Sequence, residues 1–213
     1  MDLGIMEKHN TVPVRPASSV LVWQEGPHGI EVFCGIRNPS MTFAAGQIAF
    51  PGGRLERHDA RAKALSPLSS NTKALLAYQS RHKPHGLAQA GLRELMEETG
   101  LVIGQHEHNK LQADFSALSF LCRAITPPGR VRRFDARFFA APSHAIQTII
   151  PPTEHEELLD LQYRPLTALL EDKLMPPTKL ALMQLRDLIA GEMTPKLMRG
   201  MKRIETISIS QNR

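Results

Sequence analysis

The sequence has few cysteines and no long apolar run. Only two cysteines, Cys34 and Cys122, occur in 213 residues, and both lie in apolar stretches. We therefore expect buried free thiols in a reducing compartment, not a disulfide framework. No run approaches the ~18 apolar residues that a membrane-spanning helix requires, and Met1–Asn10 carries charges but no apolar core of a secretory signal. These absences predict a cytoplasmic protein that does not enter a membrane.

Aromatic residues are scarce as well, at 5% of the chain, although the net charge is +5. The basic residues are concentrated in two segments, 54–86 and 191–213. Neither segment interleaves its basic residues with aromatic ones. The charge therefore does not favour nucleic acid as the main ligand. With 42% hydrophobic and 22% charged residues, the composition is typical of a folded globular protein.

The apolar patterning predicts strands that alternate with helices. A turn at Gly26-Pro27-His28-Gly29 separates two strand patterns and predicts a hairpin. Expected strands are 18–24, 30–37, 119–124, 134–141 and 159–163, and expected helices are 87–99, 165–172 and 178–190. The weak periodicity of residues 60–83 indicates one or two short helices there. This order favours an α/β or α+β domain with a mixed sheet covered on both faces. We expect one domain over 1–213, with a basic insertion at about 60–86 and a C-terminal helix plus tail at about 177–213.

One predicted helix carries three carboxylates on one side. At 100° per residue, Glu94, Glu97 and Glu98 share an arc of about 100°. Arg93 lies four residues before Glu97, a spacing at which the two side chains can pair. Like charges at this spacing repel by a few tenths of a kcal/mol, so stability does not explain the arrangement. A solvated acidic face is one interpretation, and a site for a hard cation such as Mg²⁺ is the other.

Together with Phe50-Pro51-Gly52-Gly53, this helix resembles the Nudix box, Gly-x5-Glu-x7-Arg-Glu-U-x-Glu-Glu-x-Gly-U, where U is a bulky aliphatic residue. Residues 93–101 match its second half and Gly53 matches its start. A contiguous box would place its first glutamate at position 59 and its arginine at position 67, but the sequence has Asp59 and Arg93. We infer an insertion after Asp59, which resembles the peroxisomal coenzyme A diphosphatase-like branch of the Nudix hydrolases.

This resemblance implies a fold and an activity. The fold would be an α/β/α sandwich with a mixed, curved sheet and a loop–helix–loop catalytic box. The activity would be metal-dependent hydrolysis of a diphosphate linkage in a nucleoside diphosphate derivative, with Mg²⁺ or Mn²⁺. A partial match to a coenzyme A signature, at Arg37, Gly46 and Phe50–Gly53, favours coenzyme A or acyl-CoA. Nucleotide sugars or dinucleotides are the alternative substrates, and a non-catalytic ligand-binding module is the alternative function.

The resemblance also implies roles for individual residues. Glu94, Glu97, Glu98 and the carbonyl of Gly52 would bind the metal. The general base is left open between Glu94 and Glu157, and Arg93 would act with the catalytic carboxylates. The substrate would be a small-molecule diphosphate, contacted by Arg37, Arg132, Arg133, Phe50 and Tyr163.

Simpler interpretations stand beside these roles. The arginines could lie on a solvated strand edge, and the aromatic residues could serve packing. The basic insertion could be a mobile lid that attracts the substrate or a disordered surface loop. The sequence does not decide whether the chain forms a homodimer.

Overall fold

Residues 14–37 form the predicted hairpin at the centre of a large sheet. The computed structural model describes residues 12–42, 44–108, 110–154, 156–200 and 202–209. The first strand, β1 (Val14–Gly26), pairs antiparallel with β2 (Gly29–Arg37) over its last residues. It is longer than the sequence predicted, and its first half pairs instead with β4 (Gly52–Arg54). Strands β2 and β4 thus pair with successive parts of the same edge of β1.

The main sheet is mixed, as expected. Its strands follow the order β12-β2-β1-β10-β9-β13-β14, with β3 added to β2 and β4 added to β1. The pairs β1–β10 and β9–β13 are parallel, and the others are antiparallel. The bounds of the remaining strands are Ile48–Ala49 for β3, Ser119–Ile125 for β9, Arg133–Pro142 for β10, Leu158–Pro165 for β12, Lys196–Arg199 for β13 and Arg203–Thr206 for β14. The strands expected at 119–124, 134–141 and 159–163 are thereby confirmed.

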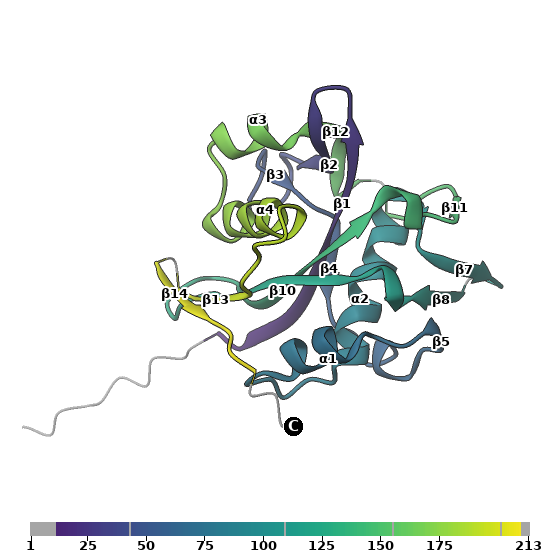
Figure 1. The fold of residues 1–213 in the computed structure, drawn as a ribbon, viewed down its shortest axis with the longest axis horizontal. Helices are drawn as coiled ribbons and strands as arrows, with labels where there is room; N and C mark the ends of the chain where they lie inside the picture. The colour runs from purple at the N-terminus through teal and green to yellow at the C-terminus, as the bar shows by residue number, and fades with distance from the viewer. Residues whose placement is uncertain (1–11, 43, 109, 155, 201, 210–213) are drawn as a thin grey trace, which may run out of the picture.

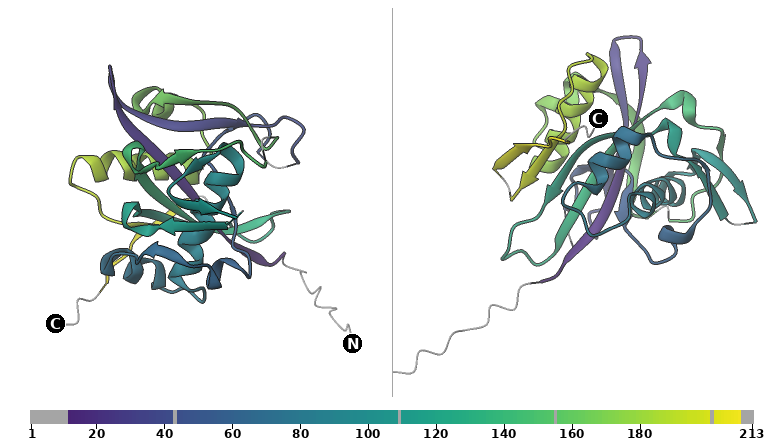
Figure 2. Two further views of the ribbon diagram at one scale, coloured as in Figure 1. Left: turned by 90° about the vertical axis from the view of Figure 1, so that its right-hand side faces the viewer. Right: turned by 60° about the horizontal axis from the view of Figure 1, so that its bottom comes forward.

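Helices cover both faces of this sheet (Figures 1 and 2). On one face, α1 (Ser70–Ala77) and α2 (Pro84–Thr99) pack against one hydrophobic core. On the other, α3 (Leu166–Glu171) and α4 (Pro176–Ile189) pack against a second core. The two cores confirm the predicted α/β/α sandwich. No helix in the described part of the chain is long and apolar enough to cross a membrane.

The helix predicted at 87–99 is α2, which begins slightly earlier, at Pro84, and ends at Thr99 with Gly100 as its C-cap. Proline at the first turn has no amide hydrogen to leave unpaired there. Gly100 has a φ of 75°, and a Cβ at this position would lie 1.9 Å from the carbonyl oxygen of Ile150. Glycine is therefore required where α2 ends, and this close approach positions the loop that follows β11.

The segment of the expected basic insertion is not a disordered surface loop. Residues 60–86 include β5 (Ala64–Ser66), α1 and the start of α2, and the side chains of Leu75 and Leu76 are buried. The short helix indicated within 60–83 is α1, which has little apolar periodicity of its own and packs against α2 in the first core. A small sheet of the order β5-β8-β7 also uses this segment, with β7 at Gly104–Glu107 and β8 at Lys110–Asp114. Another strand pair joins β6 (Leu101–Val102) to β11 (Thr148–Ile149).

The C-terminal part, expected to be a tail, contributes two strands. Strand β13 pairs in parallel with β9, and Leu197 and Met198 within it are buried. The first ten residues, on which the lack of a secretory signal was argued, and residues 210–213 lie outside the described residues. Cys34 and Cys122 are free and buried, as expected. Burial raises the pKa of Cys34 to about 11 and also raises that of Cys122, which keeps both thiols protonated.

Candidate active site

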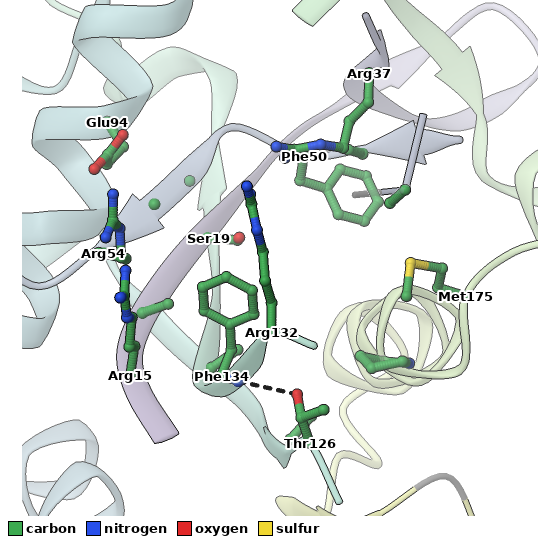
Figure 3. Close-up of a pocket in the computed structure, with 18 of the residues that line it drawn as sticks. Arg15, Ser19, Arg37, Phe50, Arg54, Glu94, Thr126, Arg132, Phe134 and Met175 are labelled. Atoms are coloured by element: carbon green, nitrogen blue, oxygen red, sulfur yellow. Dashed lines mark hydrogen bonds between the residues drawn. The ribbon is translucent and has the colours of Figure 1, made fainter. Parts of the chain in front are cut away.

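A cavity of about 1080 Å³ lies beside β4. Its walls come from β1, β4, β9, β10, α2 and the start of α4 (Figure 3). Carboxylates of α2 and of the loop after β11 line one part of the cavity, and arginines of β1, β4 and the β9–β10 connection line another. The cavity therefore has an acidic part and a basic part.

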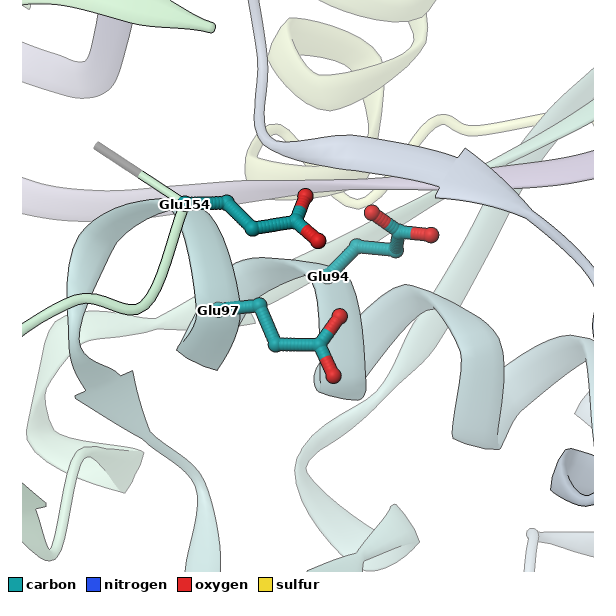
Figure 4. Close-up of side chains that lie close together, drawn as sticks. All are labelled: Glu94, Glu97 and Glu154. Carbon is teal, nitrogen blue, oxygen red and sulfur yellow. The ribbon is translucent and has the colours of Figure 1, made fainter. Parts of the chain in front are cut away.

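Three carboxylates meet at the acidic end (Figure 4). Glu94, Glu97 and Glu154 each place one oxygen so that all three oxygens lie within 4.8 Å of one another. Glu94 and Glu97 are three residues apart on α2, as the helical spacing predicted. Glu154 is held over α2 because its own amide and that of Thr153 donate to the carbonyl oxygen of Glu97, at 2.8 and 2.9 Å. The sequence showed the acidic run that contains Glu154 but not this contact.

The paired glycines fit against two of the glutamates. A Cβ on Gly53 would lie 2.3 Å from the carboxyl carbon of Glu94, so a larger residue would displace that side chain. The amide of Gly52 donates to Oε2 of Glu98 at 2.9 Å, and Glu98 is buried. Glu98 thus contacts the amide of Gly52 and lies outside the group formed by Glu94, Glu97 and Glu154.

Arg93 fixes the positions of these carboxylates. Its Nη1 donates to Glu97 Oε2 at 2.7 Å and lies 3.0 Å from Glu94 Oε1. Its Nε donates to Asp59 Oδ1 at 3.0 Å, and Asp59 is fully buried. Burial alone would lower the pKa of Arg93, but the surrounding carboxylates raise it overall. Asp59 therefore links the segment after β4 to α2.

Burial makes the acidic end unfavourable for negative charge. Burial raises the pKa of Glu94 to about 7. The positive charge of Arg93 acts in the opposite direction, and the nearby carboxylates of Glu97 and Glu154 raise the pKa further. Burial likewise raises the pKa of Glu98 to about 8, although the hydrogen bond from Gly52 acts in the opposite direction. A cluster of carboxylate oxygens that is costly to ionise is suited to a hard divalent cation. These residues therefore fit Mg²⁺ or Mn²⁺.

Three of the predicted substrate residues, Arg37, Phe50 and Arg132, line the cavity. Arg37 lies there with its Nη2 3.5 Å from Oε2 of Glu157, which also lines the cavity. Phe50 contributes its ring to the wall, and Arg132 projects over the floor beside Phe134 (Figure 3). The structure thus brings Arg37 and the candidate base Glu157 together near the carboxylate cluster.

The other two predicted substrate residues are placed differently. Arg133 borders the cavity, but its guanidinium donates to the carbonyl oxygens of Thr126 and Val12, at 3.3 and 3.0 Å. Tyr163 does not line the cavity. Its ring packs on Phe33 with centroids 5.1 Å apart, on the α2 side of the sheet, whereas Phe50 packs on the α4 side. Alternation of side chains along β12 and β2 puts Tyr163 on the opposite face from the cavity.

Two arginines of the basic part, Arg15 and Arg54, were not singled out by the sequence. They lie far apart in the sequence and meet because Ala17 on β1 pairs with Arg54 on β4. Nothing local in the sequence indicates that pairing, since β4 is only three residues long.

Comparison with known proteins supports the fold. Neither a protein-family model nor a curated protein sequence matches the chain significantly. Among solved structures, a NUDIX hydrolase from Alicyclobacillus acidocaldarius superposes with a TM-score of 0.55 at 22% identity, covering 86% of each chain. A MutT NUDIX hydrolase from Burkholderia pseudomallei gives 0.50 at 17% identity, over 82% of this chain and 99% of that one. The NUDIX domain of Shewanella oneidensis NrtR, in complex with ADP ribose, gives 0.50 at 14% identity, over 84% and 90%. The chain therefore has the fold of the Nudix hydrolases.

Proposed function

We propose that this protein is a divalent-metal-dependent diphosphatase acting on a nucleoside diphosphate derivative. The observation that carries the proposal is the group of Glu94, Glu97 and Glu154, whose oxygens lie within 4.8 Å of one another at the end of a large cavity. Such a cluster costs stability unless a cation or protons compensate it. The agreement of this cluster with a Nudix-like box on a Nudix fold supports hydrolysis as its purpose.

Glu94, Glu97, Glu98, Glu154 and the carbonyl of Gly52 are the groups that would hold Mg²⁺ or Mn²⁺. When bound, the cation would neutralise the diphosphate and favour attack by water. The other roles belong to side chains of the chain itself.

Arg93 orients Glu94 and Glu97, and Asp59 in turn holds Arg93. Glu94 and Glu157 remain the two candidates for the group that accepts the proton of the attacking water. Glu157 borders the cavity and is oriented by Arg37, which favours it as the base.

Within this class we favour coenzyme A or acyl-CoA as substrate. The support is the partial signature at Arg37 and Phe50–Gly53, together with a cavity large enough for such a molecule. Nucleotide sugars and dinucleotides are the alternative. Asp59 and Arg93 are 34 residues apart in the sequence, yet their side chains pair. This contact between the two parts of the box supports the inferred insertion between them.

A ligand-binding module without turnover is the second candidate function. The similarity to the NUDIX domain of NrtR, which was solved with ADP ribose, supports it. The presence of all three carboxylates of the second half of the box, Glu94, Glu97 and Glu98, favours an enzyme, because a binding module has no need of such an acidic cluster.

A substrate panel separates these possibilities. The purified chain is incubated with coenzyme A, acetyl-CoA, ADP-ribose, a nucleotide sugar and a dinucleotide, with Mg²⁺, with Mn²⁺ and with EDTA. Chromatography of the products should show two phosphorylated halves of one of these compounds, only when a cation is present. Tight binding of a compound that is recovered intact would instead support the binding module.

A further inference from the structure

We propose that Arg15, Arg54 and Arg132 form a second anion-binding subsite, which holds a phosphomonoester of the substrate that is separate from its diphosphate. As a statement about the substrate, this inference rests on the proposed function. It assigns a purpose to the basic part of the cavity, which the metal site does not use.

Strand geometry brings two of these arginines together. Arg15, Ala17 and Ser19 alternate along β1, and all three line the cavity, so they share one face of the strand. Ala17 lies directly opposite Arg54 of β4. Arg15 and Arg54 are therefore diagonal cross-strand neighbours, a relation in which long side chains reach each other. Figure 3 shows them one behind the other along the same wall.

The third arginine comes from the other side of the cavity. Arg132 precedes β10 and reaches back over Ser19 and Phe134 towards the same space (Figure 3). Its neighbour in sequence, Arg133, points away and donates to two backbone carbonyls. Only Arg132 of this pair is thus available to a ligand.

These three side chains have no anionic partner within the described residues, where none of them forms an ion pair or a side-chain hydrogen bond. Glu56, which follows Arg54 closely on the same wall, pairs instead with His58 at 3.4 Å. The buried arginines, by contrast, are engaged: Arg93 with Asp59, and Arg123 and Arg137 with Asp135. Neighbouring like charges do not stabilise a sheet, so folding gives no reason for this cluster.

The position of the cluster indicates what it binds. Arg54 lies between Glu94 of the metal site and Arg15, so the arginines continue the cavity away from the carboxylates (Figure 3). A diphosphate at the carboxylates would leave Arg15 and Arg132 to a group further along the substrate. Guanidinium groups bind phosphate oxygens in a bidentate manner, which suits a terminal phosphomonoester. The favoured substrate class is therefore a nucleoside diphosphate derivative that carries an additional phosphomonoester.

Equilibrium binding without turnover tests this subsite. The probes are adenosine 5′-diphosphate and its 3′-phosphorylated and 2′-phosphorylated forms, measured by calorimetry in EDTA at low salt. A charge-assisted contact predicts that one phosphorylated form binds the wild-type protein roughly tenfold or more tightly than the diphosphate alone. Arg15→Gln and Arg54→Gln should each remove most of that advantage, and high salt should reduce it.

A matched variant controls for net charge. Lys110→Gln, on the exposed β7–β8 hairpin and outside the cavity, removes one positive charge and should keep the full advantage. Thermal melting checks that each variant is folded, and Arg132→Gln replaces any variant that is not.

Equal affinity of the wild-type protein for all three probes, or an advantage that survives all three arginine substitutions, would overturn the subsite. Because the binding assay needs no turnover, a protein that hydrolyses nothing could still show the advantage. Failure of the subsite and failure of the diphosphatase proposal are thereby distinguished.

Discussion

Asp59 shows how one side chain joins parts of the site that are far apart in the sequence. It is fully buried, accepts a hydrogen bond from the amide of Glu56 at 2.7 Å and pairs with Arg93. Asp59→Asn would leave the buried guanidinium without one of its main partners. We expect the free energy of unfolding, measured with urea, to fall by about 3 kcal/mol. Turnover should fall too, because Arg93 positions Glu94 and Glu97.

Asp172→Asn is the matched control for that substitution, because Asp172 is exposed at the end of α3. Its unfolding free energy should stay within about 0.5 kcal/mol of the wild-type value. If Asp59→Asn unfolds at the same urea concentration as this control, Asp59 does not hold the site together.

The raised pKa values of Glu94 and Glu98 predict how stability changes with pH. In the folded, metal-free protein these carboxyls hold their protons up to about pH 7 and about pH 8, whereas an unperturbed glutamate releases its proton near 4.5. The folded state therefore binds more protons than the unfolded state between these limits. Their contribution to stability is fully present below pH 4.5 and is lost as the pH rises towards 8.

Urea denaturation in EDTA across this pH range measures the effect. Glu98→Gln should flatten the decline, and Glu107→Gln, on the exposed part of β7, should not. Added Mg²⁺ should restore stability at the alkaline end, because a bound cation replaces the protons. If the free energy of unfolding instead rises with pH, in both wild type and Glu107→Gln, the carboxyls of Glu94 and Glu98 do not have raised pKa values.

At the residue scale, helical spacing was sufficient to predict part of the site. Glu94, Glu97 and Arg93 are neighbours on α2, so their arrangement follows from the sequence of one helix. Glu154 joins them only because a distant loop is hydrogen-bonded to the end of α2. Tyr163 was predicted from its sequence neighbourhood, but the face to which it points depends on the pairing of β12.

At the element scale, α1 makes the sharpest difference between sequence and structure. It belongs to the segment taken for an insertion, yet Leu75 and Leu76 are only 4% and 2% exposed. Leu76→Ala should lower the free energy of unfolding by about 2–5 kcal/mol, because it leaves a cavity in the core under α2. Urea denaturation measures this loss.

Leu65→Ala on β5 is the comparison, since Leu65 is 44% exposed and its truncation leaves no buried cavity. It should cost less than about 1 kcal/mol. Similar small losses for both variants would mean that the segment does not pack as described. For the same reason, replacing 61–83 by a flexible linker should destabilise the protein strongly, contrary to what a surface loop would allow.

The short strands show why other elements could not be predicted. Strands β6, β11 and β4 have only two or three residues each, too few for an alternating pattern. Strand β13 follows a turn near the end of the chain and is defined by its parallel pairing with β9. Pairing partners, not local preference, determine all of these elements.

At the scale of the whole molecule, the sandwich places the acidic helix beside the part of the sheet where β1 changes its pairing partner. β1 pairs with β2 in one half and with β4 in the other, and the cavity occupies the space beside β4. Alternating strand and helix patterns were sufficient to predict the layers. The cavity and its basic wall were not predictable, because they depend on how β1 divides its pairing between two partners.

The most direct test of the account is the rate of diphosphate hydrolysis as a function of Mn²⁺ concentration in wild type, Glu97→Gln and Glu107→Gln. The substrate is the compound that the panel identifies. Wild type and Glu107→Gln should require the cation and saturate at similar concentrations. Glu97→Gln, although folded, should lose turnover by about two orders of magnitude or more, since it lacks one oxygen of the cluster. Hydrolysis that persists in EDTA, or a Glu97→Gln variant as active as Glu107→Gln, would contradict the assignment of the cluster as a catalytic metal site.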